Sequence, residues 1–278
     1  MTVAVLSGKG GAGKTFAAVN LAAAAGKAVY IDCDVEEPNG RLFWQPRGVT
    51  ERPVTTALPV FDREKCVGCR SCVDFCRFNA LVYVKTAPMV FPEVCHACGG
   101  CALVCPQGAV GEQHRKVGVV EEGNRDQIHV VTGVLRTGEV SAVPVIRAAL
   151  SAGLSRGALT IIDCPPGSGC PVMESVREAD YCLLVTEPTA FGLHNMAMVH
   201  QLCRLLGKPC GLLINREEAP YAPLEDYCAR EGLPILLRIP YRRQLAQWGA
   251  EGAVAVRRDE ALKAEFTRLL REIGGTAV

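Results

Sequence analysis

Short apolar runs alternate with helical stretches over most of the chain, and this alternation predicts an α/β fold. Near the amino terminus an apolar run at residues 3–6 is followed by glycines and then by an alanine-rich stretch at 14–25. A second apolar run, at 28–31, ends in acidic residues. A buried strand, a crossover helix and a second buried strand form the βαβ unit of a doubly wound, mostly parallel sheet.

The same alternation returns in the second half of the chain. We expect helices at 196–206 and 224–231, and a final helix at 259–273 whose apolar side chains share one face. The polar face of that last helix mixes acidic and basic residues, whereas a helix lying on a lipid surface is mainly basic, so we expect it to pack on the core. Buried strands are predicted at three further apolar runs: 159–162, 182–185 and 211–214.

Cysteines interrupt this pattern at every third or fourth position of a central segment. The interruption predicts an α/β domain in two parts, at 1–58 and 113–278, with an inserted small domain at 59–112. The insert repeats itself, because residues 60–62 before Cys66 resemble residues 90–92 before Cys95. Two such small units bury little apolar surface, so we expect a bound ligand to hold them together.

Composition narrows the classes of partner. The chain has 278 residues, 15 of them cysteine, and 30 basic against 29 acidic side chains. The net charge of +1 leaves no basic excess for neutralising phosphates, so we expect no nucleic-acid partner. The start lacks the pattern of a secretory signal, and no apolar run is long enough to span a bilayer. We therefore expect a cytoplasmic protein without a membrane partner, in which clustered cysteines bind metal rather than form disulfides.

A phosphate-binding loop follows the first predicted strand. The segment from Gly8 to Thr15 fits the pattern G-x-x-x-x-G-K-[ST], whose backbone N–H groups point at phosphate oxygens. Lys14 supplies a positive charge for the β- and γ-phosphates, and the Thr15 hydroxyl is a ligand for Mg²⁺. The helix that begins here directs its positive end at the same anion. The residues expected to bind the nucleotide in this loop are Gly8, Gly10, Gly11, Ala12, Gly13, Lys14, Thr15 and Phe16.

Eight cysteines of the insert follow the spacing C-x2-C-x2-C-x3-C twice. This is the spacing of bacterial two-cluster ferredoxins, in which the fourth cysteine of each run binds the cluster of the other run. Arg77 stands where that pattern has a proline after the first run. A pair of zinc sites is the competing interpretation, although a third cysteine after two more residues is not typical of structural zinc. The predicted ligands of two [4Fe–4S] clusters are Cys66, Cys69, Cys72 and Cys105 for the first, and Cys95, Cys98, Cys101 and Cys76 for the second.

An additional lysine early in the phosphate loop gives the chain a resemblance to a known group. Lys9 through Thr15, K-G-G-A-G-K-T, resembles the deviant Walker motif of the MinD/ParA ATPases, a group that includes the nitrogenase iron protein and the Mrp-type iron–sulfur carriers. The resemblance implies that Lys9 acts in catalysis by reaching across a nucleotide-sandwich homodimer. If the resemblance is set aside, the alternative interpretation of Lys9 is a solvated lysine of the loop.

Three further segments match this group in order. Asp32-Cys33-Asp34 stands at the first switch, and the resemblance implies that Asp34 orients the attacking water. Asp163 ends an apolar strand as in a Walker B motif, and the resemblance implies that its carboxylate holds Mg²⁺ through water. The second switch of these ATPases corresponds to residues 165–167. Asn215 resembles the asparagine that reads the adenine edge in this group.

The resemblance covers nearly the whole chain and implies an ATPase, binding ATP and Mg²⁺, with an inserted ferredoxin. We expect nucleotide state to be coupled to electron transfer towards an unidentified redox partner. The alternative is an ATPase that assembles or inserts a metal cluster in a partner protein, which a labile third site near Cys33, Cys164 or Cys170 would favour. A spatial-positioning role ranks third, since it needs no clusters. The segment 117–151, with a strand expected at 130–135 and a helix at 143–152, has no assigned chemistry.

Overall fold

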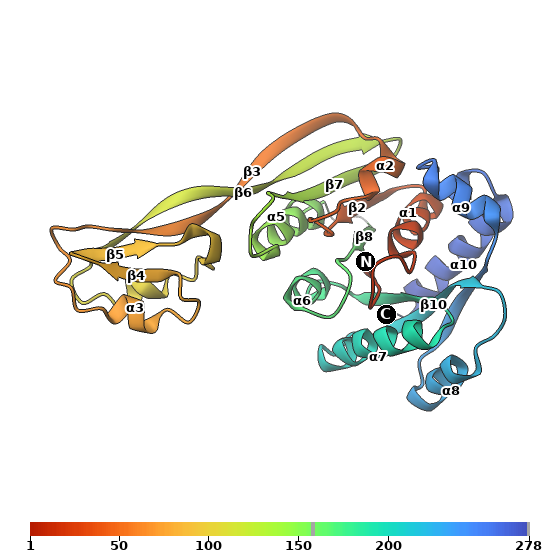
Figure 1. Cartoon of the computed structure of the whole chain (residues 1–278). Coiled ribbons are helices and arrows are strands. Elements are labelled where there is room, and N and C mark those ends of the chain that lie inside the picture. The colour runs from red at the N-terminus through yellow and green to blue at the C-terminus, as the bar shows by residue number, and fades with distance from the viewer. Residues whose placement is uncertain (157–158, 277–278) are drawn as a thin grey trace.

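The computed structural model describes residues 1–156 and 159–276, which form a three-layer α/β body and a smaller lobe held away from it (Figure 1). The strands are β1 Thr2–Leu6, β2 Ala28–Asp32, β3 Arg47–Phe61, β4 Leu81–Val84, β5 Ala87–Val90, β6 Val110–Arg125, β7 Ile128–Leu135, β8 Thr160–Asp163, β9 Tyr181–Thr186, β10 Cys210–Glu217 and β11 Ile235–Pro240. The helices are α1 Lys14–Ala25, α2 Gly40–Trp44, α3 Ser71–Phe75, α4 Gly100–Leu103, α5 Val143–Leu154, α6 Cys170–Val176, α7 Ala190–Leu205, α8 Ala222–Glu231, α9 Arg243–Ala250 and α10 Glu260–Thr276, with short 3₁₀ turns η1 Pro92–Val94 and η2 Ala255–Arg257.

The large sheet has nine strands in the order β11-β10-β9-β1-β8-β2-β7-β6-β3. The strands from β11 to β7 are parallel to their neighbours, whereas β6 and β3 run antiparallel at one edge. The register pairs Val5 with Asp163 and Asp32 with Asp163, so three sequence-distant strands end side by side. This arrangement confirms the predicted doubly wound fold and places the carboxyl ends of its central strands together.

Helices cover both faces of this sheet. One apolar core lies under α5, α6, α7 and α8, and the other lies under α1, α2, α9 and α10. The predicted inward face of the last helix is confirmed, because Leu262, Phe266, Leu269 and Ile273 are fully buried in the second core. In the part of the chain that the structure describes, no helix has the length and apolar character needed to cross a membrane.

Two strands that the sequence did not predict carry the lobe. Strands β3 and β6 pair over thirteen register positions, from Arg47 opposite Asn124 to Phe61 opposite Val110. Most of β3 is exposed, so it lacks the apolar alternation by which a half-buried strand is recognised. The predicted domain boundaries at 58/59 and 112/113 both fall inside this two-stranded ribbon.

The lobe consists of two halves related by a shift of 29 residues. Both halves begin a short helix two residues after their second cysteine, α3 in the first half and α4 in the second. A positive φ recurs at equivalent positions in the two halves: Gly68 and Ala97, Arg70 and Gly99, Asn79 and Gly108. The backbone hydrogen bond from Asp62 N to Ala109 O is matched by one from Phe91 N to Ala80 O. Such reciprocal pairing indicates an approximate two-fold axis through the lobe.

The two ends of the lobe are also equivalent. Phe61 faces Val110 at the end of the ribbon, and under the 29-residue shift this pair corresponds to Val90 and Leu81 of the β4–β5 hairpin. A two-residue turn after Val84 closes that hairpin, whereas the equivalent strands continue into the large sheet. The lobe is therefore attached to the body through one of its two symmetric hairpins.

Candidate functional site

A cavity of about 830 Å³ opens at the carboxyl end of the central strands. The phosphate loop lines it from one side, where Gly11 and Gly13 have φ values of 82° and 97° that favour glycine. Helix α1 begins at Lys14, so its first N–H groups face the cavity. The lining from the loop and from the start of the helix comprises Gly10, Gly11, Gly13, Lys14, Thr15 and Phe16.

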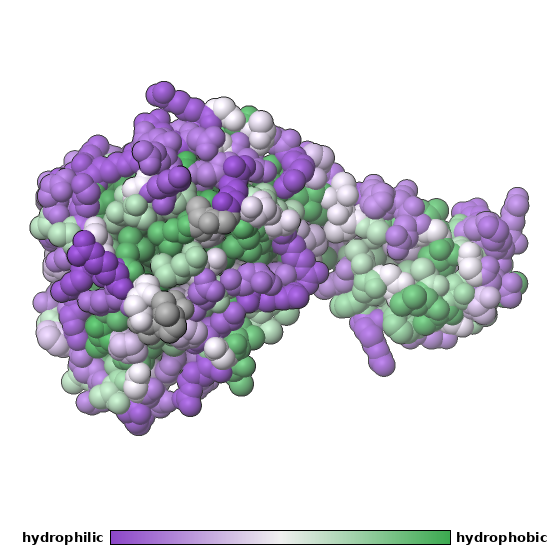
Figure 2. Space-filling model, turned by 180° about the vertical axis from the view of Figure 1, so that it is seen from behind, coloured by the Kyte–Doolittle hydropathy of each residue, from purple (hydrophilic) through white to green (hydrophobic). Residues whose placement is uncertain are grey.

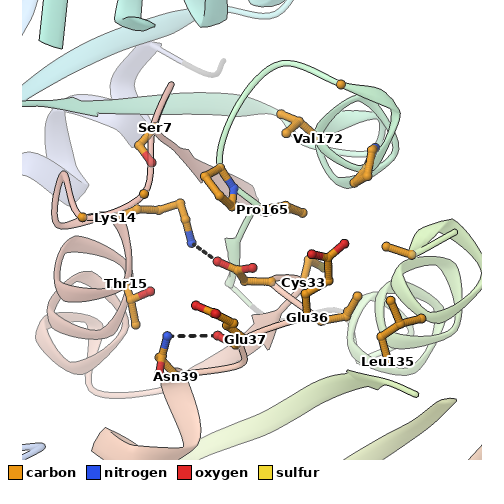
Figure 3. Close-up of a pocket in the computed structure, with 18 of the residues that line it drawn as sticks. Ser7, Lys14, Thr15, Cys33, Glu36, Glu37, Asn39, Leu135, Pro165 and Val172 are labelled. Atoms are coloured by element: carbon orange, nitrogen blue, oxygen red, sulfur yellow. Dashed lines mark hydrogen bonds and ion pairs between the residues drawn. The ribbon is translucent and has the colours of Figure 1, made fainter. Parts of the chain in front are cut away.

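Lys14 lies buried among carboxylates at the floor of this cavity (Figure 3). Its Nζ donates to Asp163 Oδ1 at 2.5 Å and lies 3.5 Å from Asp34 Oδ2. Burial by itself would lower the pKa of Lys14, but the charges of Asp163 and Asp34 outweigh it and raise that pKa. The lysine therefore stays protonated, and it is positioned to exchange these carboxylates for phosphate oxygens.

Asp32 and Asp163 are both fully buried. Asp163 Oδ2 accepts from the Tyr30 hydroxyl at 2.9 Å, and Asp32 accepts from the backbone N–H groups of Gly40 and Asp34. Burial, followed by the charge of Asp163, raises the pKa of Asp32 well above its usual value. Asp32 thus holds the segment that carries Asp34 in place, while Asp34 itself lines the cavity.

Asn215 contacts the phosphate loop from behind. Its Nδ2 donates to Ala12 O at 3.0 Å, and a Cβ on Gly13 would collide with this amide. Gly8 has a similar constraint, since a Cβ there would collide with the backbone of Asn195. Gly8, Ala12 and Asn215 therefore support the loop by close packing, and a role of Asn215 in reading adenine stays a prediction.

The Lys9 side chain is directed away from the cavity. Its Nζ donates to Glu187 Oε2 at 2.8 Å and lies 5.2 Å from the centre of the Phe191 ring. Glu187 also accepts from Arg216 at 2.7 Å. Burial opposes ionisation of Glu187, but the hydrogen bonds and charges of Lys9 and Arg216 hold its pKa below the usual value. Lys9 is thus held by an acid of its own subunit.

The cysteines of the lobe surround two separate cavities. Cys66, Cys69, Cys72 and Cys105 line one of them, which has a volume of about 20 Å³. Cys76, Cys95, Cys98 and Cys101 line the other, which has a volume of about 210 Å³. The fourth cysteine of each run thus lies with the first three of the opposite run. Among the described residues, no three or more His, Cys, Asp or Glu side chains are arranged to hold a single metal ion.

Among the described residues, Cys33, Cys164 and Cys170 do not form a group that could hold a metal ion. Cys33 and Cys164 follow the paired Asp32 and Asp163, and both thiols are fully buried. Burial raises the pKa of each of these thiols well above its usual value. Cys170 is exposed at the first residue of α6.

Comparison with known families identifies the nucleotide-binding part. A family described as the CobQ/CobB/MinD/ParA nucleotide binding domain matches residues 3–256. The chain belongs to this family. Two relatives in Methanocaldococcus jannaschii, the uncharacterized proteins MJ0579 and MJ0578, are 27% and 33% identical to it. The alignments cover 78% and 68% of this chain, and 80% and 68% of the relatives.

Solved structures of the same fold are also similar. The cell division ATPase MinD of Pyrococcus furiosus superimposes with a TM-score of 0.61 at 20% identity, over 99% of this chain and 98% of that one. The septum site-determining protein MinD of Pyrococcus horikoshii, in complex with Mg-ADP, gives 0.60 at 20% identity, over 100% and 99%. The likeness shows a MinD-type fold for this member of the family.

A third relative resembles a small part of the chain. The uncharacterized ferredoxin MJ0722 of Methanocaldococcus jannaschii is 38% identical over 55 residues, which make up 18% of this chain and 71% of that protein. This match is consistent with a ferredoxin-like segment in this CobQ/CobB/MinD/ParA chain.

One wall of the nucleotide cavity was not predicted. The loop between β7 and α5 contributes Arg136, Thr137, Gly138 and Glu139 to the lining. The sequence of this segment predicts no chemistry, because it contains none of the family's motifs. The one available signal was the position of the loop, directly after a predicted strand of a parallel sheet, where ligands bind in α/β folds.

Proposed function

We propose that this chain is an ATP-hydrolysing iron–sulfur protein, in which the nucleotide state controls electron transfer through two [4Fe–4S] clusters towards a partner protein. The observation that carries the proposal is the grouping of eight cysteines around two cavities in the cross-wise pattern of two-cluster ferredoxins. These cavities stand on a ribbon that is continuous with the sheet of a nucleotide-binding domain.

The donor set fits clusters better than single ions. A zinc ion requires four ligands that converge on one point, and the described residues offer no such group. A [4Fe–4S] cluster spreads its four thiolates over four iron atoms, so its ligands surround a cavity instead. When bound, such clusters supply one-electron chemistry, and the chain supplies the thiolates and N–H donors such as Ala109 N, 3.3 Å from Cys105 Sγ.

The position of the lobe supports a link to the nucleotide. Strand β7 ends at Leu135, opposite Gly118 of β6, at the carboxyl edge of the sheet. Residues 110–117 of β6 continue past this edge, which at about 3.3 Å per residue carries the lobe roughly 25 Å beyond it. The lobe thus projects on the side of the molecule where the phosphate loop and the acidic residues lie.

The surface of the lobe is suited to a protein partner. Figure 2 shows apolar surface on the lobe, bordered by polar side chains. Large apolar side chains are exposed there, and several are close to the cysteine runs: Val67, Phe75, Phe78, Val94 and Leu103. We propose a redox partner that docks on this surface, and a homodimer in which Lys9 reaches the nucleotide of the other subunit.

The test uses the full chain purified without oxygen. We expect about eight iron atoms per chain, and a reduction potential or rate of cluster oxidation that changes when Mg-ATP is added but not when it is added to Lys14→Ala. Clusters that respond identically with and without nucleotide would overturn the coupling. Absence of iron after anaerobic reconstitution would overturn the iron–sulfur assignment.

The alternative role in metal-cluster assembly needs a labile site outside the lobe. The positions of Cys33 and Cys164 do not favour it, because both thiols are fully buried. Iron transfer from the purified protein to an apo-acceptor, dependent on ATP and abolished by Cys170→Ala, would favour assembly over electron donation.

A further inference from the structure

Arg115 of the ribbon contacts both the nucleotide-binding body and the lobe. Its Nη1 and Nη2 donate to the two carboxylate oxygens of Glu139 at 2.8 and 2.5 Å. Its Nη2 also donates to Pro92 O at 3.3 Å. The side chains of Arg115 and Glu139 are only 22% and 5% exposed, so this forked pair is largely shielded from solvent.

On the body side, the pair is continuous with the nucleotide cavity. Glu139 lines that cavity from the middle of the β7–α5 loop. The same loop is attached to the first switch, since Leu135 N donates to the carbonyl of Val35, the residue after Asp34. Arg136 N donates to Val117 O of the ribbon. Backbone hydrogen bonds thus connect the Asp34 segment to the β7–α5 loop that carries Glu139.

On the lobe side, the contact lies beside the second cysteine cavity. Pro92 begins the turn η1, which ends directly before Cys95. Cys95 N donates to Pro92 O as well, so this carbonyl is shared between the cysteine run and Arg115. A shift of Arg115 therefore acts on the segment that positions Cys95.

We propose that Arg115 is a positioning residue that couples the first switch to the second cysteine cavity, a role that rests on the proposed nucleotide-dependent function. A two-stranded ribbon bends and twists easily, so without a cross-contact the lobe would follow the body only loosely. The forked pair with Glu139 fixes the position of the lobe relative to the body at one point. The first switch lies next to this pair, and it is the segment that a bound nucleotide rearranges.

Hydrogen–deuterium exchange of the full, cluster-loaded chain tests this role, with and without Mg-AMPPNP. In the unaltered protein we expect slower exchange in the phosphate loop and a changed exchange rate in the segment around residues 90–98. Arg115→Ala and Arg115→Gln, at a residue outside the lining of the nucleotide cavity, are expected to keep the protection of the phosphate loop but to reduce the lobe response at least threefold. Lys116→Ala is the matched control: its exposed side chain lies on the same ribbon and pairs with Glu51, which is also on the ribbon, at 3.5 Å.

A merely structural brace gives a different result. It would change exchange in the lobe equally in both nucleotide states and leave the nucleotide-dependent difference intact, which would overturn the proposal. An absent lobe response in the unaltered protein, with the phosphate loop protected, would overturn it as well. Lack of protection in the phosphate loop would instead contradict nucleotide binding itself. If Arg115→Ala does not fold, Arg115→Gln, which keeps much of the side chain's length but cannot form the charged, forked pair, decides the question.

Discussion

Lys14 is the counter-charge for carboxylates that meet where three strands end. Asp32, Asp34 and Asp163 would repel one another in the absence of the lysine, and burial intensifies the repulsion because little water screens it. The three carboxylates therefore repel one another, and a bound Mg²⁺ ion would relieve this repulsion.

Replacing Asp34 by Asn separates stability from function. Burial raises the pKa of Asp34, Lys14 lowers it and Asp163 raises it, with a net rise above the usual 3.8. Because the folded state holds this proton more tightly, the free energy of unfolding falls as pH rises from that value through the raised pKa. Asp34→Asn should thus raise the Tm of the nucleotide-free protein at neutral pH, with the gain vanishing towards pH 4, and lower the hydrolysis rate about 10²-fold. Equal melting temperatures at every pH would contradict this account.

Glu187 restrains Lys9 within its own subunit. If Lys9 acts across a homodimer, it must leave Glu187, so Glu187→Gln should favour the ATP-dependent dimer. Loss of one half-buried, charge-assisted pair, about 1 kcal/mol, corresponds to roughly a fivefold change in the dimerisation constant. Analytical ultracentrifugation in the presence of Mg-AMPPNP measures the dimerisation constant. Glu217→Gln, which disturbs the neighbouring pair with Arg238 at 2.6 Å, is the control and should leave dimerisation unchanged.

At the scale of elements, the repeat of the lobe determines which cysteines act together. Cys72 and Cys76 are close in the sequence but line different cavities, whereas Cys76 and Cys101 line the same one. The shared 29-residue shift, with positive φ at equivalent positions, produces this crossing.

Paired cysteine substitutions test whether the fourth cysteine of each run binds the cluster of the other run. Cys76→Ala with Cys101→Ala should remove one cluster and leave about four iron atoms per chain, while Cys76→Ala with Cys72→Ala should remove both clusters. Iron and sulfide analysis with electron paramagnetic resonance distinguishes the two. Equal iron content in the two double variants would contradict the crossed assignment.

The elements also show where sequence reasoning succeeds. Strands such as β1, β8 and β9 are buried on both faces, so they appear as continuous apolar runs and were predicted within two residues of their ends. Strands β3 and β6 form a ribbon that is largely solvent-exposed, and their pairing depends on hydrogen bonds that leave no apolar period. The contact between Arg115 and Glu139 joins residues 24 positions apart through this unpredicted ribbon, so no local motif could indicate it.

At the scale of the whole molecule, the β3–β6 ribbon connects the lobe to the body. The large sheet has helices on both faces, and residues 62–109 of the lobe contribute nothing to either of its apolar cores. The body should therefore fold without the lobe.

A deletion tests this independence. Residues 62–109 are replaced by Asn-Gly, so that the facing Phe61 and Val110 become the last pair of a simple hairpin. We expect the affinity for Mg-ADP to stay within about threefold, because no lining residue of the nucleotide cavity is removed. Calorimetric titration measures it, with Lys14→Ala in the same background as the non-binding control. An insoluble product, or one that does not bind nucleotide, would show that the body depends on the lobe.

The symmetry of the lobe has a consequence for how such chains can be joined. The turn at Lys85 and Thr86 occupies the place that, in the other half, opens into the ribbon. The lobe therefore has two equivalent attachment points: one hairpin continues into the body, and the other is closed by a short turn. Cutting the chain at the turn and joining Phe61 to Val110 through a short loop would give a circular permutant of the lobe, with the same thiols around the same cavities. A second protein module inserted at this turn would place the two cysteine cavities in series between two protein modules.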